Sequence, residues 1–180
     1  IIGNYGMEIS CYNSYKGEVD IIESVSLKVD KDHLLKRAKE IRIKCGYTNY
    51  VGDSLEFHDS GMVTLPLLGT GAAIEDKLVF DPKREKRRLI YSEVIDAFRE
   101  YTVFIGGSSS YDMAPEPYNK LYALKKYCDY LGLSNENVVY FGDDWEMGGG
   151  DRQLFLSDIH FVPVEDYRRF REKSEFLLRN

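Results

Sequence analysis

Apolar residues in the last third of the chain recur in alternating helix and strand patterns. Four apolar residues recur at helical spacing, namely Leu121, Leu124, Cys128 and Leu131. Gly132 follows them, and glycine commonly ends helices. Two short apolar runs, 138–141 and 161–164, predict strands, with a short helix at 153–156 between them and a last helix from residue 165 onward. The order helix, strand, helix, strand, helix is typical of a parallel α/β sheet.

The pattern before residue 115 is different, because it mixes hairpins with helices. Residues 1–12 predict a strand, a turn and a second strand, and alternating apolar positions predict a strand over 21–29. Residues 55–65 predict a β-hairpin whose turn lies at 59–61. This region therefore indicates an α+β arrangement.

Two helices are expected in the same region. The first follows the capping pair Asp30 and Asp32, and its predicted buried face comprises Leu34, Leu35, Ala38 and Ile41. The second is expected to begin at Asp81-Pro82, an N-cap residue followed by a proline, with the basic run 83–88 as its solvated first turns. Its predicted inward residues are Leu89, Ile90, Val94, Ile95 and Phe98. A strand is predicted at 103–105.

These elements predict an α/β protein with an inserted α+β domain. The boundaries follow the change of pattern: residues 1–19 lead into the insertion, 20–114 form it, and 115–180 belong to the parallel α/β domain. Residues 115–180 supply about two strands, whereas ordinary sheets have about five or six. We therefore expect further strands upstream of Ile1 or on a partner chain.

Composition narrows the classes of protein that fit. A hydrophobic content of 43% and a charged content of 30% are typical of a globular protein. The net charge of −6 argues against a general nucleic-acid binder. There is neither an apolar stretch of membrane-spanning length nor a secretory signal. Three widely spaced cysteines without a CxxC pair indicate a cytoplasmic protein, and the three histidines have no metal-binding spacing.

The candidate chemistry follows the apolar run 138–141. Gly142, Asp143 and Asp144 come directly after it, and a glycine-rich stretch then leads to Asp151. Open α/β sheets bind ligands at the carboxyl ends of their strands, and carboxylates there suit Mg²⁺, which often shares its ligands with a phosphate. The alternative is a surface turn with solvated acids.

Lys120 adds a cation to this end of the sheet. It opens a predicted helix, where a positive charge opposes the helix dipole, so a nearby anion would explain its position. A cation, a helix N-terminus and paired acids together suit phosphoryl transfer. The alternative is a surface lysine without a function.

With these motifs the sequence resembles the haloacid dehalogenase (HAD) superfamily, and within it the eukaryotic-type phosphomannomutases and their large-cap relatives. The matching stretches are 107–112 leading to Pro115, Asn119-Lys120, 140–143, 148–151 and 163–166, with weaker matches at 4–6 and 61–69. The resemblance implies part of a Rossmann-like parallel core with an inserted α+β cap, a Mg²⁺ cofactor, a phosphorylated sugar as substrate and dimerisation through the cap.

The resemblance also implies roles for individual residues. Lys120 would hold the transferred phosphate, and the metal ligands would be Asp143, Asp151 and Asp144. Substrate-binding positions would be Ser110, Asp112, Thr70 and Lys77. Thr70 and Lys77 stand where the mutases have arginines that grip a second phosphate, and neither can form the arginine fork.

The family's attacking aspartate, in an Asp-x-Asp-Gly motif, has no match in these residues. The Asp-x-Asp at 30–32 precedes a helix and is more simply a capping pair. The nucleophile is therefore expected upstream of Ile1. Three hypotheses follow: a Mg²⁺-dependent sugar-phosphate phosphatase acting through an aspartyl-phosphate, a phosphomannomutase interconverting mannose 1- and 6-phosphate, and a non-catalytic binding domain derived from the same fold.

Overall fold

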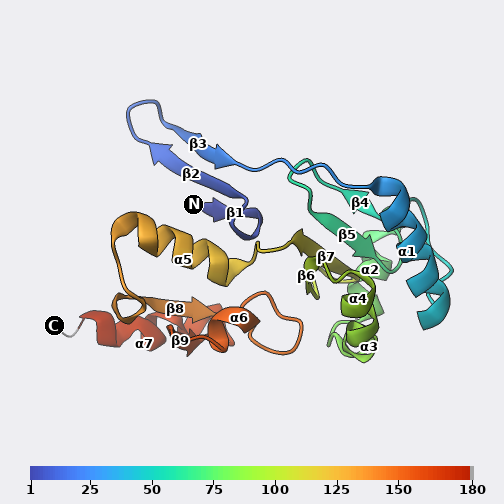
Figure 1. Cartoon of the computed structure of the whole chain (residues 1–180). Helices are drawn as coiled ribbons and strands as arrows, with labels where there is room; N and C mark the ends of the chain where they lie inside the picture. The colour runs from blue at the N-terminus through green and yellow to red at the C-terminus, as the bar shows by residue number, and fades with distance from the viewer. Residues whose placement is uncertain (179–180) are drawn as a thin grey trace.

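A computed structural model describes residues 1–178, and in this part of the chain the strands form three sheets (Figure 1). The first is antiparallel and contains β1 (Ile2–Gly3), β2 (Glu8–Asn13) and β3 (Glu18–Ser24). The strand, turn and strand expected over 1–12 are confirmed. The strand expected over 21–29 is wrong in its bounds, because only the residues that pair with β2 are in β3, and 25–30 cross to the next sheet.

The second sheet is antiparallel, has four strands and carries most of the buried core. Its order is β4-β5-β7-β6, with β4 at Glu56–Phe57, β5 at Val63–Pro66, β6 at Tyr101–Phe104 and β7 at Ser110–Pro115. The hairpin predicted over 55–65 is confirmed by the antiparallel pairing of β4 with β5. The register places Thr64 opposite Asp112, and both alternate with buried apolar neighbours along their strands.

Helix α1 (Lys31–Cys45) packs against this sheet largely as its spacing predicts. The Asp30 side chain accepts a hydrogen bond from the backbone nitrogen of His33, which confirms Asp30 as the helix cap, whereas Asp32 lies in the first turn of the helix. Leu34 is buried with Ala38 and Ile41, but Leu35 is exposed. The buried stripe is therefore narrower than predicted.

The helix expected to begin at Asp81-Pro82 is wrong. Helix α2 (Ile74–Phe80) ends there, and two short helices follow, α3 (Glu85–Leu89) and α4 (Tyr91–Ala97). The carboxylate of Asp81 does accept backbone hydrogen bonds, but from Lys86 and Arg87, across a turn. Leu89 and Ile95 are exposed, which differs from the prediction, whereas Ile90, Val94 and Phe98 are buried as expected.

The third sheet is the parallel pair of β8 (Val139–Gly142) and β9 (His160–Pro163), as the sequence predicts. Helix α5 (Lys120–Leu131) precedes it and ends at Gly132 in the left-handed conformation. Helix α6 (Arg152–Phe155) links the two strands. In place of a long last helix, α7 spans only Phe170–Ser174, between single 3₁₀ turns at Tyr167–Arg169 and Glu175–Leu178.

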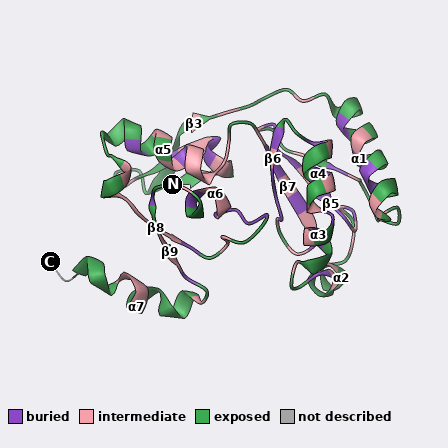
Figure 2. Ribbon diagram, turned by 60° about the horizontal axis from the view of Figure 1, so that its bottom comes forward, coloured by how far each residue is buried: buried purple, intermediate pink, exposed green. Residues whose placement is uncertain are grey.

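Burial is unevenly distributed over the molecule (Figure 2). The larger apolar cluster lies between the four-stranded sheet and helices α1 and α4, and includes Val63, Leu65, Phe98, Tyr111 and Met113. By contrast, β8 is only half-buried along most of its length, although strands of parallel sheets are usually covered on both faces. No helix within residues 1–178 combines the length and apolar character needed to cross a membrane.

Candidate functional site

A cavity of about 540 Å³ lies where the three sheets approach one another. Figure 1 shows α5 between the first sheet and the pair β8–β9, with the four-stranded sheet beside its N-terminal end. The cavity is lined from all of these elements, by Ile2, Asn4, Tyr5, Gly6, His58, Met62, Thr64, Asp112, Lys120, Ala123, Leu124 and Tyr140. Two of the predicted site residues, Lys120 and Asp112, therefore face a common space.

Lys120 is held at one end of this cavity by Asp151. Its Nζ donates to Oδ1 of Asp151 at 2.6 Å, and the hydroxyl of Tyr140 donates to the same oxygen at 3.0 Å. The other oxygen, Oδ2, accepts from the backbone nitrogens of Asp143 and Asp144, each at 3.1 Å. Asp151 is thus a buried carboxylate whose acceptor positions are filled by the protein.

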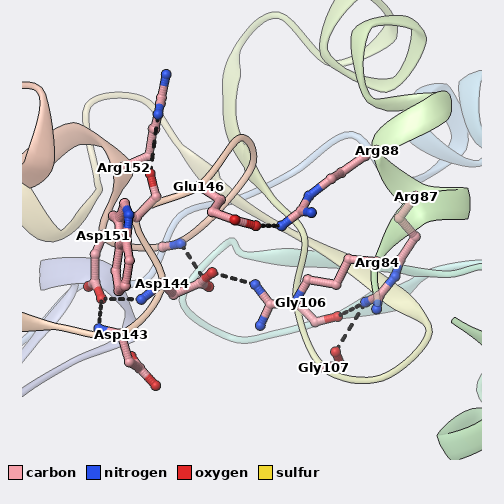
Figure 3. Close-up of polar contacts among 12 residues, drawn as sticks. Arg84, Arg87, Arg88, Gly106, Gly107, Asp143, Asp144, Glu146, Asp151 and Arg152 are labelled. Atoms are coloured by element: carbon pink, nitrogen blue, oxygen red, sulfur yellow. Dashed lines mark hydrogen bonds and ion pairs between the residues drawn. The ribbon is translucent and has the colours of Figure 1, made fainter. Parts of the chain in front are cut away.

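The remaining acids of residues 143–151, which we call the acidic loop, differ in their environment. Asp144 forms an ion pair with Arg84 through Oδ1 and accepts from the backbone nitrogen of Gly150 through Oδ2 at 3.1 Å. Asp143 is exposed, lies in a hollow of about 380 Å³ beside Arg84 and Asp144, and has no side-chain partner in the described structure. Figure 3 shows its carboxylate pointing away from the other acids.

The opposite wall of the cavity is a chain of polar groups on the four-stranded sheet. The Thr64 hydroxyl donates to Oδ1 of Asp112 at 3.2 Å, and Nε2 of His58 lies 3.0 Å from the same hydroxyl. Burial raises the pKa of Asp112, and this effect outweighs the opposing hydrogen bond from Thr64. Asp112, Thr64 and His58 therefore form a connected set of hydrogen-bonding groups along the cavity.

Tyr5 connects the two walls. Its ring stacks on Phe104 with centroids 4.2 Å apart, and both Asn4 and Tyr5 have positive φ angles, which non-glycine residues adopt rarely. Burial, together with the nearby Asp112, Asp144 and Asp151, raises the pKa of the Tyr5 hydroxyl. Tyr5 is therefore a neutral hydrogen-bonding group among the site's carboxylates.

Three further predicted site residues lie outside this cavity. The Ser110 hydroxyl donates to the carbonyl of Gly106 at 3.2 Å. Lys77 donates to the backbone oxygen of Thr70 at 3.1 Å, and the Thr70 hydroxyl accepts from the nitrogen of Asp53 at 2.8 Å. The structure thus brings Thr70 and Lys77 together, but away from Lys120 and Asp112.

Sequence reasoning missed His58, Thr64 and the arginines near the acidic loop. His58 and Thr64 meet Asp112 through strand pairing that joins residues far apart in the sequence. The basic run 83–88 was expected to be solvated, which is wrong for Arg87, since its side chain is 1% exposed. The available signal for His58 and Thr64 was that both are polar residues of the predicted hairpin, where Thr64 alternates with the apolar Val63 and Leu65.

The carboxylates of the acidic loop are the ligand type that a hard divalent cation prefers, but only some of them are available to bind one. Oxygen ligands are what Mg²⁺ prefers, and it is commonly bound through one or two carboxylates with water and phosphate completing its shell. Asp143 offers a free carboxylate, whereas Asp151 would have to exchange a donor for the cation. Among the described residues, no three acidic, histidine or cysteine side chains converge on one point.

The acid-tipped parallel strand, the glycine-rich acidic loop and the lysine at the start of the adjacent helix have the arrangement that a resemblance to the HAD class of folds implies. The family model of eukaryotic phosphomannomutase matches residues 32–163. The chain belongs to that family.

Named relatives agree with this assignment. A phosphomannomutase of Glycine max is 31% identical over 135 residues, covering 70% of this chain and 52% of the relative. A phosphomannomutase of Encephalitozoon cuniculi is 28% identical over 128 residues, covering 66% of this chain and 48% of the relative. The chain spans about half the length of the curated relatives it matches.

Solved structures support the fold. The N-terminally truncated IMP-nucleotidase of Plasmodium falciparum superposes with a TM-score of 0.59 at 15% identity, over 99% of this chain and 49% of that one. Its IMP-bound form gives a TM-score of 0.58 at 14% identity. At this level of identity the likeness concerns the fold alone.

Proposed function

We propose that this chain is part of a HAD-type phosphohydrolase that acts on a phosphorylated sugar through an aspartyl-phosphate. The observation that carries the proposal is the contact of Lys120 with Asp151 at one end of a cavity whose other end is the wall formed by Asp112, Thr64 and His58. Lys120 would bind the phosphate, and the opposite wall would bind the sugar hydroxyls. The family's enzymes are generally Mg²⁺-dependent, and Asp143 would provide a carboxylate to that ion.

The attacking aspartate would dock between β1 and β8. Within the described chain β1 pairs only with β2, and β8 pairs only with β9, so each has an open edge. The cavity lies between Ile2 of β1 and Tyr140 of β8, over Ala123 and Leu124 of α5. A strand placed there would bring an aspartate at its carboxyl end close to Lys120, as the chemistry requires.

Hydrolysis is favoured over mutase chemistry by the charges in the cavity. A sugar bisphosphate needs a second phosphate site, yet none of the described arginines lines the cavity, and Lys120 and His58 are its basic residues. The second candidate is a phosphomannomutase activity, which the family match favours.

Activity of the full-length protein tests both candidates. We expect Mg²⁺-dependent release of phosphate from hexose phosphates, lost in Lys120→Ala and Asp143→Asn. Lys126→Ala is the matched control, because Lys126 is an ion-paired lysine of the same helix outside the cavity. Full turnover in both site variants would refute the proposal. Interconversion of mannose phosphates that requires a bisphosphate activator and releases no phosphate would establish the second candidate.

A further inference from the structure

The four-stranded sheet with helices α1 to α4 is here called the four-stranded sheet unit, and the acidic loop is attached to it by three polar contacts. Arg84 forms an ion pair with Asp144, and Arg88 forms one with Glu146 (Figure 3). The backbone nitrogen of Ile105 donates to the carbonyl of Gly148 at 2.8 Å. These contacts join segments that are about 40 to 60 residues apart in the sequence, so they depend on the tertiary fold.

The backbone of Arg84 is unusual. It has φ 60° and ψ 15°, the left-handed conformation, and directly precedes α3 without capping it through its side chain. Glycine adopts this conformation at no steric cost, whereas other residues are disfavoured there. An arginine at such a position is explained if its side chain has a specific partner, and that partner is Asp144.

Asp144 in turn shapes the acidic loop. Its Oδ2 accepts from Gly150 at 3.1 Å, and its backbone oxygen accepts from the nitrogen of Asp151 at 2.9 Å. The turn is tight, since a Cβ atom built on Gly149 would lie 2.2 Å from the Asp144 carbonyl oxygen. The orientation of Asp144 therefore determines where the loop returns to Asp151.

We propose that Arg84 is a positioning residue that holds Asp144 within the acidic loop and thereby leaves Asp143 as the loop carboxylate open to a divalent cation. The part that concerns the cation rests on the proposed function. Arg84 acts through Asp144 and contacts no reacting group. Arg88 and Ile105 hold the neighbouring part of the loop through their contacts with Glu146 and Gly148.

Amide hydrogen exchange in the full-length protein tests the positioning role without turnover. Arg84→Gly removes the guanidinium and relieves the left-handed backbone, so the variant is expected to fold. We expect the amides of Gly150 and Asp151 to exchange about tenfold faster in Arg84→Gly, and also in Arg84→Ala. Arg99→Ala, which breaks an exposed ion pair with Asp96, is the control and should leave both amides unchanged. Unchanged exchange in Arg84→Gly would overturn the proposal.

Calorimetric titration with Mn²⁺ tests whether Asp144 is withheld from the cation. Arg84→Gly should bind Mn²⁺ about three- to tenfold more tightly than the wild type, because a cationic group is removed and a carboxylate is released. The double variant Arg84→Gly with Asp144→Asn has the wild-type net charge and should return to wild-type affinity. Equal tightening in both variants, or in neither, would refute this part. If the wild type binds no Mn²⁺, the part of the proposed function that requires a divalent cation is refuted. The positioning role of Arg84 is then tested by amide exchange alone.

Discussion

The buried ion pair between Arg87 and Asp81 gives the sharpest test of how the four-stranded sheet unit is stabilised. The two side chains are 1% and 3% exposed, and Nε of Arg87 lies 3.0 Å from Oδ2 of Asp81. The same guanidinium donates from Nη1 to the carbonyls of Gly106 at 2.7 Å and Gly107 at 3.1 Å. Replacing Arg87 by methionine keeps much of the volume but leaves a buried carboxylate without its cation.

The expected cost of Arg87→Met follows from this geometry. Removing one partner of a buried ion pair typically costs about 3–5 kcal/mol. Asp81 keeps two backbone donors, from Lys86 and Arg87, so we expect the lower part of that range. For a protein of this size, about 3 kcal/mol corresponds to a fall in melting temperature of about 6–12 °C.

Thermal unfolding followed by circular dichroism at pH 7 measures this shift, with Arg99→Ala as the control. The control removes an exposed arginine with 77% of its side chain accessible, and such pairs contribute little to stability. A melting temperature of Arg87→Met equal to that of the control would refute the reasoning, because the buried pair would then make no net contribution.

Acid should also lower the stability of the folded state through Asp81. Burial raises the pKa of Asp81, but hydrogen bonds from Arg87 and Lys86 outweigh it and hold the pKa below its usual value. The stability that Asp81 contributes is therefore complete above pH of about 4 and is lost as the pH falls through its lowered pKa.

Three further variants probe the cavity. Burial raises the pKa of Asp112, so its charge destabilises the folded state above pH of about 4. Asp112→Asn keeps the acceptor for Thr64 and should therefore raise the melting temperature at pH 7 but not at pH 3.5. An equal gain in melting temperature at both pH values would contradict this. Lys120→Met should lower the unfolding free energy by about 1–2 kcal/mol, because buried Asp151 loses a partly exposed cation. Urea titration measures this free energy, and an unchanged value would show that the ion pair does not stabilise the fold. Gly106→Ala would place a Cβ atom 2.0 Å from Oδ2 of Asp112 and should raise KM more than it lowers kcat; unchanged steady-state kinetics would exclude a role of Asp112 in binding.

Local patterns predicted the elements whose determinants are local. The apolar spacing of α5, its terminal Gly132 and the capping of α1 by Asp30 all depend on residues within a few positions of one another. The parallel pairing of β8 with β9 also follows from the helix between them. These features were predictable because the spacing of apolar residues and the capping and terminating residues lie within or next to each element.

The features that could not be predicted depend on contacts that the local sequence pattern does not specify, some of them between distant residues. Arg87 is indistinguishable in the sequence from its basic neighbours, and its burial depends on carbonyls of Gly106 and Gly107 about twenty positions later. The Asp81-Pro82 pair has the local signature of a helix start, but its carboxylate binds amides across a turn. The contact of His58 with Thr64, and through it with Asp112, likewise requires the strand register.

The distribution of apolar and polar contacts explains why the candidate site lies where it does. The large apolar cluster is internal to the four-stranded sheet unit. The contacts that join this unit to the rest include a small apolar cluster containing Met7, Met62 and Phe104, the ion pairs of Arg84 and Arg88, and the backbone hydrogen bond from Ile105 to Gly148. Partly exposed ion pairs contribute little free energy to such a joint, so the small apolar cluster and the stacking of Tyr5 on Phe104 are its main stabilising contacts. The cavity lies at this joint and is lined from both sides of it, by Lys120 and Tyr140 on one side and by Asp112 and Thr64 on the other. A ligand that contacts both Lys120 and Asp112 would therefore bridge the two parts of the molecule across this joint.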